Sequence, residues 1–404
     1  MTTGAARRSV APVTANDARA ASGAGTSLYV HVPFCVVKCG YCDFNSYVVD
    51  DRAVHDVFLD ALTAELRREW RHGTPVSVFV GGGTPSLLDP VRFARLFAAI
   101  AEVVPLRECA EVTVEANPES MTREKAEIAR AAGVNRFSMG VQTFDPARLR
   151  FLDRAHSAER AEAAFAELRA AGAANVSVDL MFGIPGETLA QWQADLERAL
   201  ALQPDHLSCY NLTFEPGTRL HHDLEHGRVV TNDEEADRAM FVHTRERLAA
   251  AGFVAYEISN FAGRGGPCRH NDHYWLQGDY VGVGPGASSH RAGQRWTNLK
   301  PVEAWAKAAL AGLPCAGSAE TLRPRQRAAE AIWLGLRRAD GVDLGVVAAR
   351  TGVAAQVWFA EDIAAHRRAG WIDVDGDVLS LTPAGLLLAD RVSGDYLAPG
   401  VPRR

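Results

Sequence analysis

Long hydrophobic runs are missing from this 404-residue sequence, in which no stretch reaches the roughly 18 residues that a membrane-spanning helix needs. The first 26 residues are rich in Ala, Ser, Thr, Gly and Arg, and they lack the hydrophobic core of a secretory signal. We interpret residues 1–26 as a disordered leader, with a transit peptide as the alternative. A cytoplasmic protein without an integral membrane segment is expected.

An excess of positive charge is also missing. The formal net charge is −6, and Arg and Glu are interspersed along the chain rather than gathered in blocks. A protein that binds nucleic acid through its phosphates needs a basic surface. We therefore expect no nucleic-acid partner.

An even number of cysteines is missing too, because the chain has seven. The odd count and the lack of a secretion signal both argue against a disulfide framework. Three of the cysteines, Cys35, Cys39 and Cys42, stand close together, and the other four are scattered. A second C-x2-C pair, which would complete a structural zinc site, is absent. The spacing C-x3-C-x2-C favours a 4Fe-4S cluster held by three thiolates with one iron left open, and zinc remains the alternative.

What the sequence does contain is a regular alternation of short β-branched runs and amphipathic stretches from residue 27 onward. The expected strands are 28–32, 76–81, 111–116, 136–142, 175–182 and 206–213, and the expected helices between them are 54–71, 90–103, 123–132, 158–171 and 189–202. Such alternation predicts an α/β fold with a parallel sheet, which right-handed crossovers curl into a barrel or partial barrel. An open Rossmann-type sheet is the alternative, although no G-x-G-x-x-G follows the first strand.

Beyond residue 300 the pattern turns helical, and it ends in a predicted hairpin at 371–381 and a short helix from Pro383. Helices followed by a hairpin are typical of a winged-helix module. We therefore predict three parts: a leader (1–26), a barrel (27–300) that segment 280–286 closes, and a C-terminal helical, winged-helix-like domain (301–404).

Unusual residues gather just past the predicted strand ends, at 31–47, 82–86, 115–118, 142 and 183–188. In parallel α/β barrels this rim carries the chemistry, because its loops vary over a rigid base. The segment 31–47 reads HVPFCVVKCGYCDFNSY, with Tyr41 directly before the third cysteine. This C-x3-C-x-aromatic-C loop resembles that of the radical SAM superfamily. The resemblance implies that S-adenosylmethionine chelates the open iron and is split to a 5′-deoxyadenosyl radical.

Further segments resemble the S-adenosylmethionine site of the coproporphyrinogen dehydrogenase family, strand by strand. The glycine run 81–83 can approach a methionyl amine closely because it carries no side chains. The resemblance implies that the cofactor contacts are Tyr29, Tyr41, Gly82, Gly83, Thr84, Glu115, Gln142, Arg154 and Asp179. For Arg154 the alternative is an ordinary salt bridge at a helix end, and for Glu115 a solvated charge.

Similarity to the oxygen-independent coproporphyrinogen III oxidase-like family covers nearly the whole chain, from Leu28 to about Leu388. Its dehydrogenase members carry a further cysteine two positions after the third cluster cysteine, where this chain has Phe44, and they carry a longer N-terminal extension. Both departures favour the haem-chaperone members. The resemblance implies that the protein binds haem and passes it to an acceptor, such as a respiratory haem protein. A dehydrogenase or another radical SAM enzyme is the alternative function.

Residues 268–275 (CRHNDHYW) resemble a signature linked with haem binding in the chaperone members. Imidazole suits haem iron, and aromatic side chains can cover a porphyrin face. We therefore predict His270 as the iron ligand. The alternatives are a polar loop in which histidines bond backbone carbonyls, and a zinc site of Cys268, His270 and His273.

Overall fold

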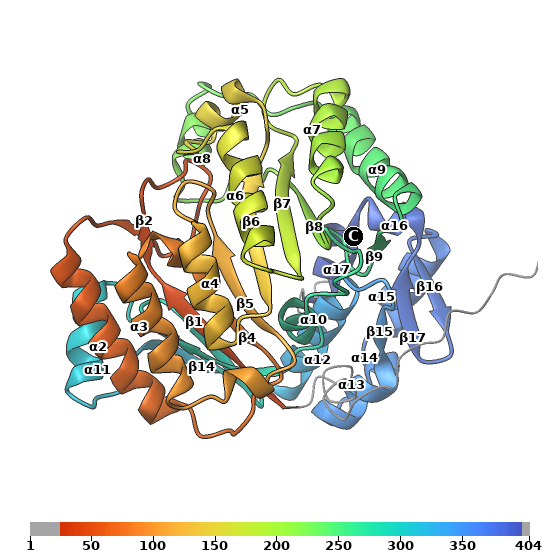
Figure 1. Cartoon of the computed structure of the whole chain (residues 1–404). Helices are drawn as coiled ribbons and strands as arrows, with labels where there is room; N and C mark the ends of the chain where they lie inside the picture. The colour runs from red at the N-terminus through yellow and green to blue at the C-terminus, as the bar shows by residue number, and fades with distance from the viewer. Residues whose placement is uncertain (1–24, 398–404) are drawn as a thin grey trace, which may run out of the picture.

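A curved sheet forms the centre of the computed structural model, which describes residues 25–397 (Figure 1). In sheet order the strands are β14 (Ala316–Thr321), β13 (Gln294–Asn298), β12 (Ser288–Arg291), β11 (Asp279–Val283), β1 (Thr26–Val32), β4 (Val78–Gly82), β5 (Val112–Ala116), β6 (Arg136–Gln142), β7 (Val176–Phe182), β8 (His206–Asn211), β10 (Asn260–Ala262) and β9 (Val254–Ala255). The run from β1 to β8 is parallel throughout. This confirms the predicted partial barrel of six strands and excludes the Rossmann alternative.

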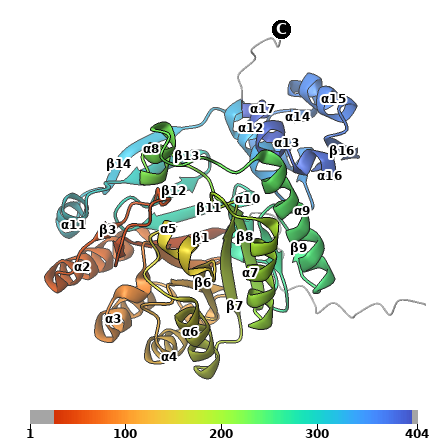
Figure 2. The same cartoon turned by 90° about the horizontal axis from the view of Figure 1, so that it is seen from above.

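Helices cover the outer side of the parallel strands, as the view from above shows (Figure 2). They are α2 (Arg52–Glu69), α3 (Pro90–Ala101), α4 (Arg123–Ala132), α6 (Ala158–Ala170) and α7 (Leu189–Ala201). Each begins after a residue whose side chain accepts a backbone N–H of the first turn, namely Asp51, Asp89, Thr122, Ser157 and Thr188. Such N-caps satisfy donors that a helix start otherwise leaves unpaired, and they explain why the predicted starts lie within two residues of the observed ones.

Successive side chains of a strand point to opposite faces, and here the two faces differ in character. The outward residues, such as Val30, Val80 and Val114, are apolar and buried in one large hydrophobic core with the helices. Many of the inward residues are polar, such as Glu115 on β5 and Asp179 on β7. The core therefore lies between sheet and helices, and the hollow of the barrel is left for polar chemistry.

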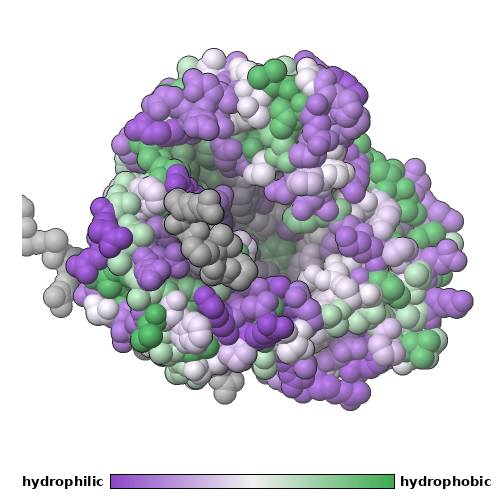
Figure 3. Space-filling view, turned by 180° about the vertical axis from the view of Figure 1, so that it is seen from behind, coloured by the Kyte–Doolittle hydropathy of each residue, from purple (hydrophilic) through white to green (hydrophobic). Residues whose placement is uncertain are grey.

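One segment that follows the barrel strands differs from the prediction. Residues 279–283 form β11, which lies beside β1 and extends the sheet instead of closing it. Within residues 25–397, the edge strands β14 and β9 do not pair with each other. The concave side of this open sheet is hollowed when the molecule is seen from behind (Figure 3).

A second hydrophobic core begins at Ala328 and belongs to the C-terminal part. Its elements are α12 (Pro324–Gly335), β15 (Val342–Asp343), α13 (Leu344–Thr351), α14 (Ala355–Trp358), α15 (Ala360–Arg368), β16 (Ile372–Asp375), β17 (Val378–Leu381), α16 (Pro383–Leu386) and α17 (Ala389–Leu397). The helices and the β16–β17 hairpin lie where the winged-helix-like pattern predicts them.

The join between the two cores lies later than residue 300. Helix α11 (Val302–Leu310) contributes Trp305 to the first core, and Cys315 before β14 is buried there too. We therefore propose a boundary between β14 and α12. Most of the predicted leader lies outside the described residues. Among residues 25–397, no helix combines the length and hydrophobicity that crossing a bilayer requires.

The alternative of a polar loop at residues 268–275 is wrong, because Cys268 is the N-cap of helix α10 (Arg269–Trp275). The carboxylate of Glu111, just before β5, accepts the backbone N–H of Arg269 at 2.8 Å and that of His270 at 3.0 Å. A carboxylate at a helix start satisfies its free donors. The cap comes from more than 150 residues away in the chain, so no local sequence signal announces the helix.

Candidate functional site: two adjoining chambers in the barrel

The three clustered cysteines lie on the loop that leaves β1. Cys35 ends β2 (Phe34–Cys35), which pairs with β3 (Tyr47–Val48), and the N–H of Cys42 donates to the carbonyl of Cys39 at 3.1 Å. The Thr84 hydroxyl donates to the Cys35 sulfur at 3.6 Å, and Arg154 donates to the Cys39 sulfur at 3.7 Å. All three cysteines border a cavity of about 400 Å³, which we call the cluster chamber.

Burial raises the pKa of Cys35 and raises that of Cys42 to about 11. These thiols therefore stay protonated until a cation stabilises the thiolate form, as iron does. Among residues 25–397, no group of three Cys, His, Asp or Glu side chains converges as a single metal ion requires. Three thiols spread along the wall of a chamber fit a multi-iron cluster, and they do not fit a mononuclear zinc site.

The glycine run at the end of β4 forms one wall of the cluster chamber, and each glycine is needed for its space. A Cβ on Gly81 would lie 2.5 Å from a Glu115 carboxylate oxygen, and one on Gly83 would lie 2.7 Å from the Phe34 carbonyl oxygen. Gly82 has φ +107°, and a Cβ there would collide with the His31 ring. The backbone is thus bare where a cofactor would approach it.

Two carboxyl groups face the cluster chamber from neighbouring strands. Glu115 accepts the N–H of Gly82 at 2.9 Å, and burial raises its pKa to about 7. Asp179 accepts the Ser138 hydroxyl at 2.9 Å, and burial raises its pKa as well. These carboxyls can accept hydrogen bonds from the ammonium and ribose hydroxyl groups that S-adenosylmethionine carries.

Arg154 and Gln142 complete the wall opposite the cysteines. Arg154 donates to Asn117 Oδ1 at 3.0 Å and to the Gly140 carbonyl at 2.7 Å, and its Nε is buried without a partner among the described residues. It borders the cluster chamber. Gln142 has φ +68° at a register shift between β6 and β7, a backbone state that favours glycine and that concentrates at functional sites.

All the predicted site residues border the cluster chamber except Tyr29 and His270. Tyr41 does so from the cluster loop, and it packs against the small core that contains Leu152 and Met181. Tyr29 and His270 border a second cavity of about 850 Å³. The two cavities adjoin, because Phe44, Phe79, Glu115 and Asn271 border both of them.

The second cavity, which we call the aromatic chamber, is bordered by Tyr29, Phe79, Tyr274 and Tyr280 inside the barrel and by Lys38, Phe44, Tyr47 and Lys300 toward its rim. Its volume falls within the roughly 300–1,000 Å³ of small-molecule sites. Aromatic walls with two cationic side chains at the mouth suit a flat, apolar molecule that bears anionic groups. Porphyrins with propionates have this chemistry.

Helix α10 supplies the floor of the aromatic chamber. His270 is 1% exposed and lies flat against Phe79, with ring centroids 5.0 Å apart. Its Nδ1 is 2.8 Å from the Ser77 hydroxyl, and its Nε2 is 2.8 Å from the Tyr274 hydroxyl. Burial lowers the pKa of His270 well below its ordinary value, so the ring is neutral. It has one N–H and one lone pair, and both are in use.

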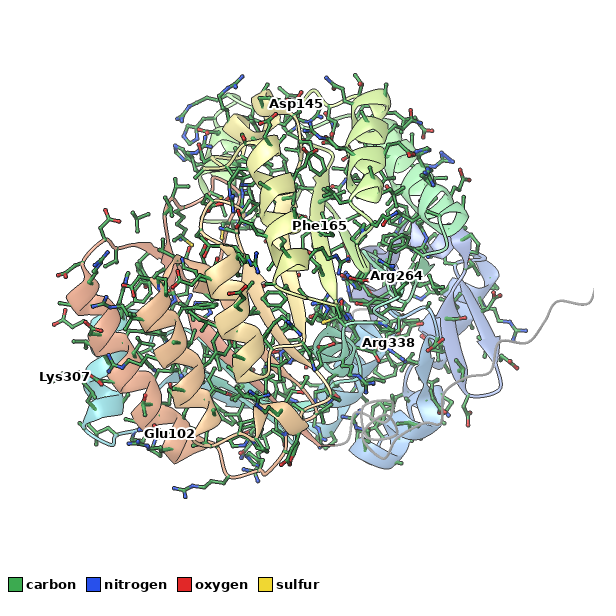
Figure 4. The ribbon with its side chains drawn as sticks, viewed as in Figure 1. Glu102, Asp145, Phe165, Arg264, Lys307 and Arg338 are labelled. Carbon is green, nitrogen blue, oxygen red and sulfur yellow. The ribbon has the colours of Figure 1, made fainter. Side chains whose placement is uncertain are left out.

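The other residues of the predicted signature point elsewhere. His273 bonds the Asp279 carbonyl at 2.8 Å, as the polar-loop alternative expects of a histidine, and the Cys268 sulfur lies 3.6 Å from Glu111. Cys268, His270 and His273 thus have separate partners, and the zinc alternative finds no support. Asp272 forms an ion pair with Arg338 at 2.7 Å. Figure 4 labels Arg338 between α10 and the C-terminal helices.

Sequence reasoning missed several residues of the cluster chamber, including Asn117, Arg136, Ser138, Ser208 and Tyr210. Four of them, Arg136, Ser138, Ser208 and Tyr210, alternate along β6 and β8 with the buried apolar residues Phe137, Met139, Leu207 and Cys209. A polar residue at every second position of an otherwise buried strand was the available signal. In Figure 4, Asp145 beyond β6 marks the rim end of the barrel, and Glu102 after α3 marks the opposite end.

Comparisons with known proteins identify similar families and chains. Residues 29–199 match the Radical SAM superfamily, and residues 322–388 match the HemN C-terminal domain. "Heme chaperone HemW" of Mycobacterium tuberculosis is 41% identical over 90% of this chain and 93% of its own length. "Heme chaperone HemW" of Bacillus subtilis is 35% identical over 92% of this chain and 99% of its own.

The chain belongs to the HemW family of radical SAM proteins.

Similarity within the HemW family thus runs through the barrel and the C-terminal part alike. Among solved structures, the chain resembles that titled "Coproporphyrinogen III oxidase (HemN) from Escherichia coli is a Radical SAM enzyme", with a TM-score of 0.79 over 94% of this chain and 92% of that one. The identity is 22%, so this likeness speaks for the fold alone. Radical SAM membership implies a 4Fe-4S cluster and S-adenosylmethionine.

Proposed function

We propose that this protein is a haem chaperone: it binds haem in the barrel, holds a 4Fe-4S cluster and S-adenosylmethionine beside it, and passes the haem to an acceptor protein. The observation that carries the proposal is the 41% identity to "Heme chaperone HemW" of M. tuberculosis across nine-tenths of both chains. Two chambers that share a wall support it, because they offer separate places for a cluster with its cofactor and for a porphyrin.

Cys35, Cys39 and Cys42 would hold the cluster. The Gly81–Gly83 backbone, Glu115 and Asp179 would receive S-adenosylmethionine, since the bare backbone and the buried carboxyls offer space and acceptors. Arg154 lies against the Cys39 sulfur and offsets the negative charge of the thiolates. The bound cluster would supply the electron for cleaving S-adenosylmethionine, and the described residues orient that cofactor and shield it from water.

The second candidate is an oxygen-independent coproporphyrinogen III dehydrogenase, which the shared fold with HemN favours. Phe44 speaks against it. This side chain is 56% exposed and stands at the mouth of both chambers, where the dehydrogenase pattern has another cysteine. An apolar residue there supplies no thiol for chemistry, and it does supply a surface over which a porphyrin can pass.

Haem titration of the anaerobically purified protein tests the proposal. We expect a Soret band that saturates at about one haem per chain beside the broad cluster absorbance. We also expect transfer of that haem to a haem-free acceptor protein. Incubation with coproporphyrinogen III, S-adenosylmethionine and a reductant should yield no protoporphyrinogen IX. Turnover to protoporphyrinogen IX without stable haem binding would instead establish the dehydrogenase.

A further inference from the structure

His270, the predicted iron ligand, offers no free nitrogen. A ligating imidazole must direct one nitrogen lone pair at the iron from about 2 Å. In this structure both ring nitrogens lie 2.8 Å from hydroxyl oxygens, those of Ser77 and Tyr274, and the ring is 1% exposed. The face of the ring is also covered, because it stacks on Phe79. A haem iron therefore cannot reach His270 without dismantling this packing.

These bonds form a buried chain that gives each group a defined role. Ser27 and Ser77 are joined hydroxyl to hydroxyl at 2.9 Å, and Ser77 then meets Nδ1 of His270. When Nδ1–H donates toward the serines, Nε2 is the acceptor and the Tyr274 hydroxyl is the donor. A phenol that donates its proton keeps its oxygen lone pairs for another partner.

Tyr274 is more accessible than His270. It stands one helical turn further along α10, it is partly exposed, and it borders the aromatic chamber. Its ring is fixed edge-on between His270 at 4.6 Å and Tyr280 at 4.5 Å, measured between centroids. The side chain therefore has little freedom, and its oxygen is tied to His270. Tyrosine oxygen is among the established protein ligands of haem iron.

We propose that the phenol oxygen of Tyr274 is the iron ligand for haem in the aromatic chamber, and that His270 acts as a positioning residue that holds this oxygen in place. The inference rests on the haem binding proposed above. If the phenol oxygen binds iron, Tyr274 would give up its O–H proton, and water at the chamber would take that proton, because burial keeps the His270 ring neutral. Lys38 and Lys300, both exposed at the chamber mouth, suit the two propionates.

Ferric haem titrations of Tyr274→Phe, His270→Gln and Tyr280→Phe, read by visible and EPR spectra, test the assignment. Tyr274→Phe should lose the phenolate-to-iron charge-transfer band and weaken haem binding more than about 100-fold, beyond what loss of a supporting partner does. His270→Gln can still accept from Tyr274, so it should keep the band and weaken binding about tenfold. Tyr280→Phe is the matched control, with the band retained. Cluster absorbance in each variant reports that the barrel is folded.

The opposite pattern identifies histidine as the ligand. Removing the Tyr274 hydroxyl frees Nε2 of His270, so a histidine-bound haem would bind Tyr274→Phe as well as wild type or more tightly, and His270→Gln would lose the ligand signature. That result overturns the inference while leaving the proposed function intact. Absence of any haem complex in the wild type would instead refute the proposed function. Resonance Raman of the wild-type complex adds a test without variants: enhanced phenolate modes support Tyr274, and their absence contradicts it.

Discussion

The cluster chamber and the aromatic chamber lie side by side in one barrel, but they are built in different ways. The cluster chamber is made by loops and strand ends, where Cys35, Gly82 and Glu115 each follow or end a strand. The aromatic chamber depends on α10, which Glu111 caps and Arg338 ties to the C-terminal part. Short-range sequence order thus defines the first chamber, and long-range packing defines the second.

The largest effect is expected from removing a cluster ligand. Cys42→Ala should reduce bound iron from about four atoms per chain to none, with loss of the cluster absorbance and of the reduced-state EPR signal, because three thiolates are the minimum that the open-iron cluster uses. Haem binding should persist, since Cys42 is not among the residues that border the aromatic chamber. Cys109→Ala, which removes a buried thiol outside both chambers, is the control and should keep its iron. A full iron complement in Cys42→Ala would refute the ligand assignment.

The second-largest effect is expected from a methyl group added to the glycine wall. Gly82→Ala places a Cβ against the His31 ring and disturbs the bond to Glu115, so we expect S-adenosylmethionine affinity to fall more than about tenfold. Gly73→Ala is matched to it, because Gly73 also has positive φ (+70°) but no atom within 4 Å of the added Cβ. Isothermal titration of both anaerobic proteins decides between steric blockage and general strain. Equal losses of S-adenosylmethionine affinity in the two variants would show that backbone strain, and not steric blockage, causes the effect.

The pH dependence of cofactor binding should follow Glu115. Its pKa in the folded protein is raised to about 7, so the acid is charged above that pH and neutral below it. A charged carboxylate accepts hydrogen bonds from cofactor donors better, so affinity should fall as pH drops through about 7, by up to about tenfold per pH unit. Glu115→Gln should bind more weakly above pH 7 and show a flat profile. A wild-type profile that is flat between pH 6 and pH 8, on the order of one unit either side of that pKa, would exclude this role.

The raised pKa of Glu115 also makes the stability of the cofactor-free protein depend on pH. The pKa of Glu115 is near 4.5 when unfolded and about 7 when folded, so the folded state binds the proton more tightly. This group therefore favours the folded state most at low pH, and that contribution is lost as pH rises from about 4.5 to about 7. Glu115→Gln should remove the trend, which denaturant unfolding at several pH values measures.

The smallest effect is expected at the tie between α10 and the C-terminal part. Arg338→Ala breaks the ion pair with Asp272, whose side chains are 15% and 22% exposed, and should lower the free energy of unfolding by about 1 kcal/mol. Haem affinity should fall slightly while cluster content stays the same. Arg123→Ala, which breaks an exposed pair with Glu127, should change stability by less than about 0.5 kcal/mol. If Arg123→Ala lowered the free energy of unfolding more than Arg338→Ala, the expectation that the more buried ion pair stabilises more would be contradicted.

Most of the barrel was predictable, because β-branched runs, Asp and Ser or Thr caps, and strand-end motifs are local signals. The strand 136–142 and the helix 123–132 were predicted to the residue. The cluster chamber could be assembled from sequence for the same reason: parallel strands bring their ends together whatever the loops between them contain.

What could not be predicted depends on distant partners. Glu111 turns residues 269–275 into a helix, Ser77 and Tyr274 occupy both nitrogens of His270, and β11 joins the edge of the sheet at β1. Apart from the bond to Tyr274, which lies one helical turn away, these contacts join positions more than 150 residues apart in the chain. The motif itself was found from the sequence, and the hydrogen bonds that occupy both nitrogens of His270 were not.

Spectra of two variants side by side test the account most directly. Cys42→Ala and Tyr274→Phe are each reconstituted anaerobically with iron, sulfide and haem, and the visible spectrum is recorded. Two separately built chambers predict that Cys42→Ala keeps the wild-type Soret band without cluster absorbance, and that Tyr274→Phe keeps the cluster absorbance with a lost or displaced Soret band. Loss of both signals in either variant would contradict the account.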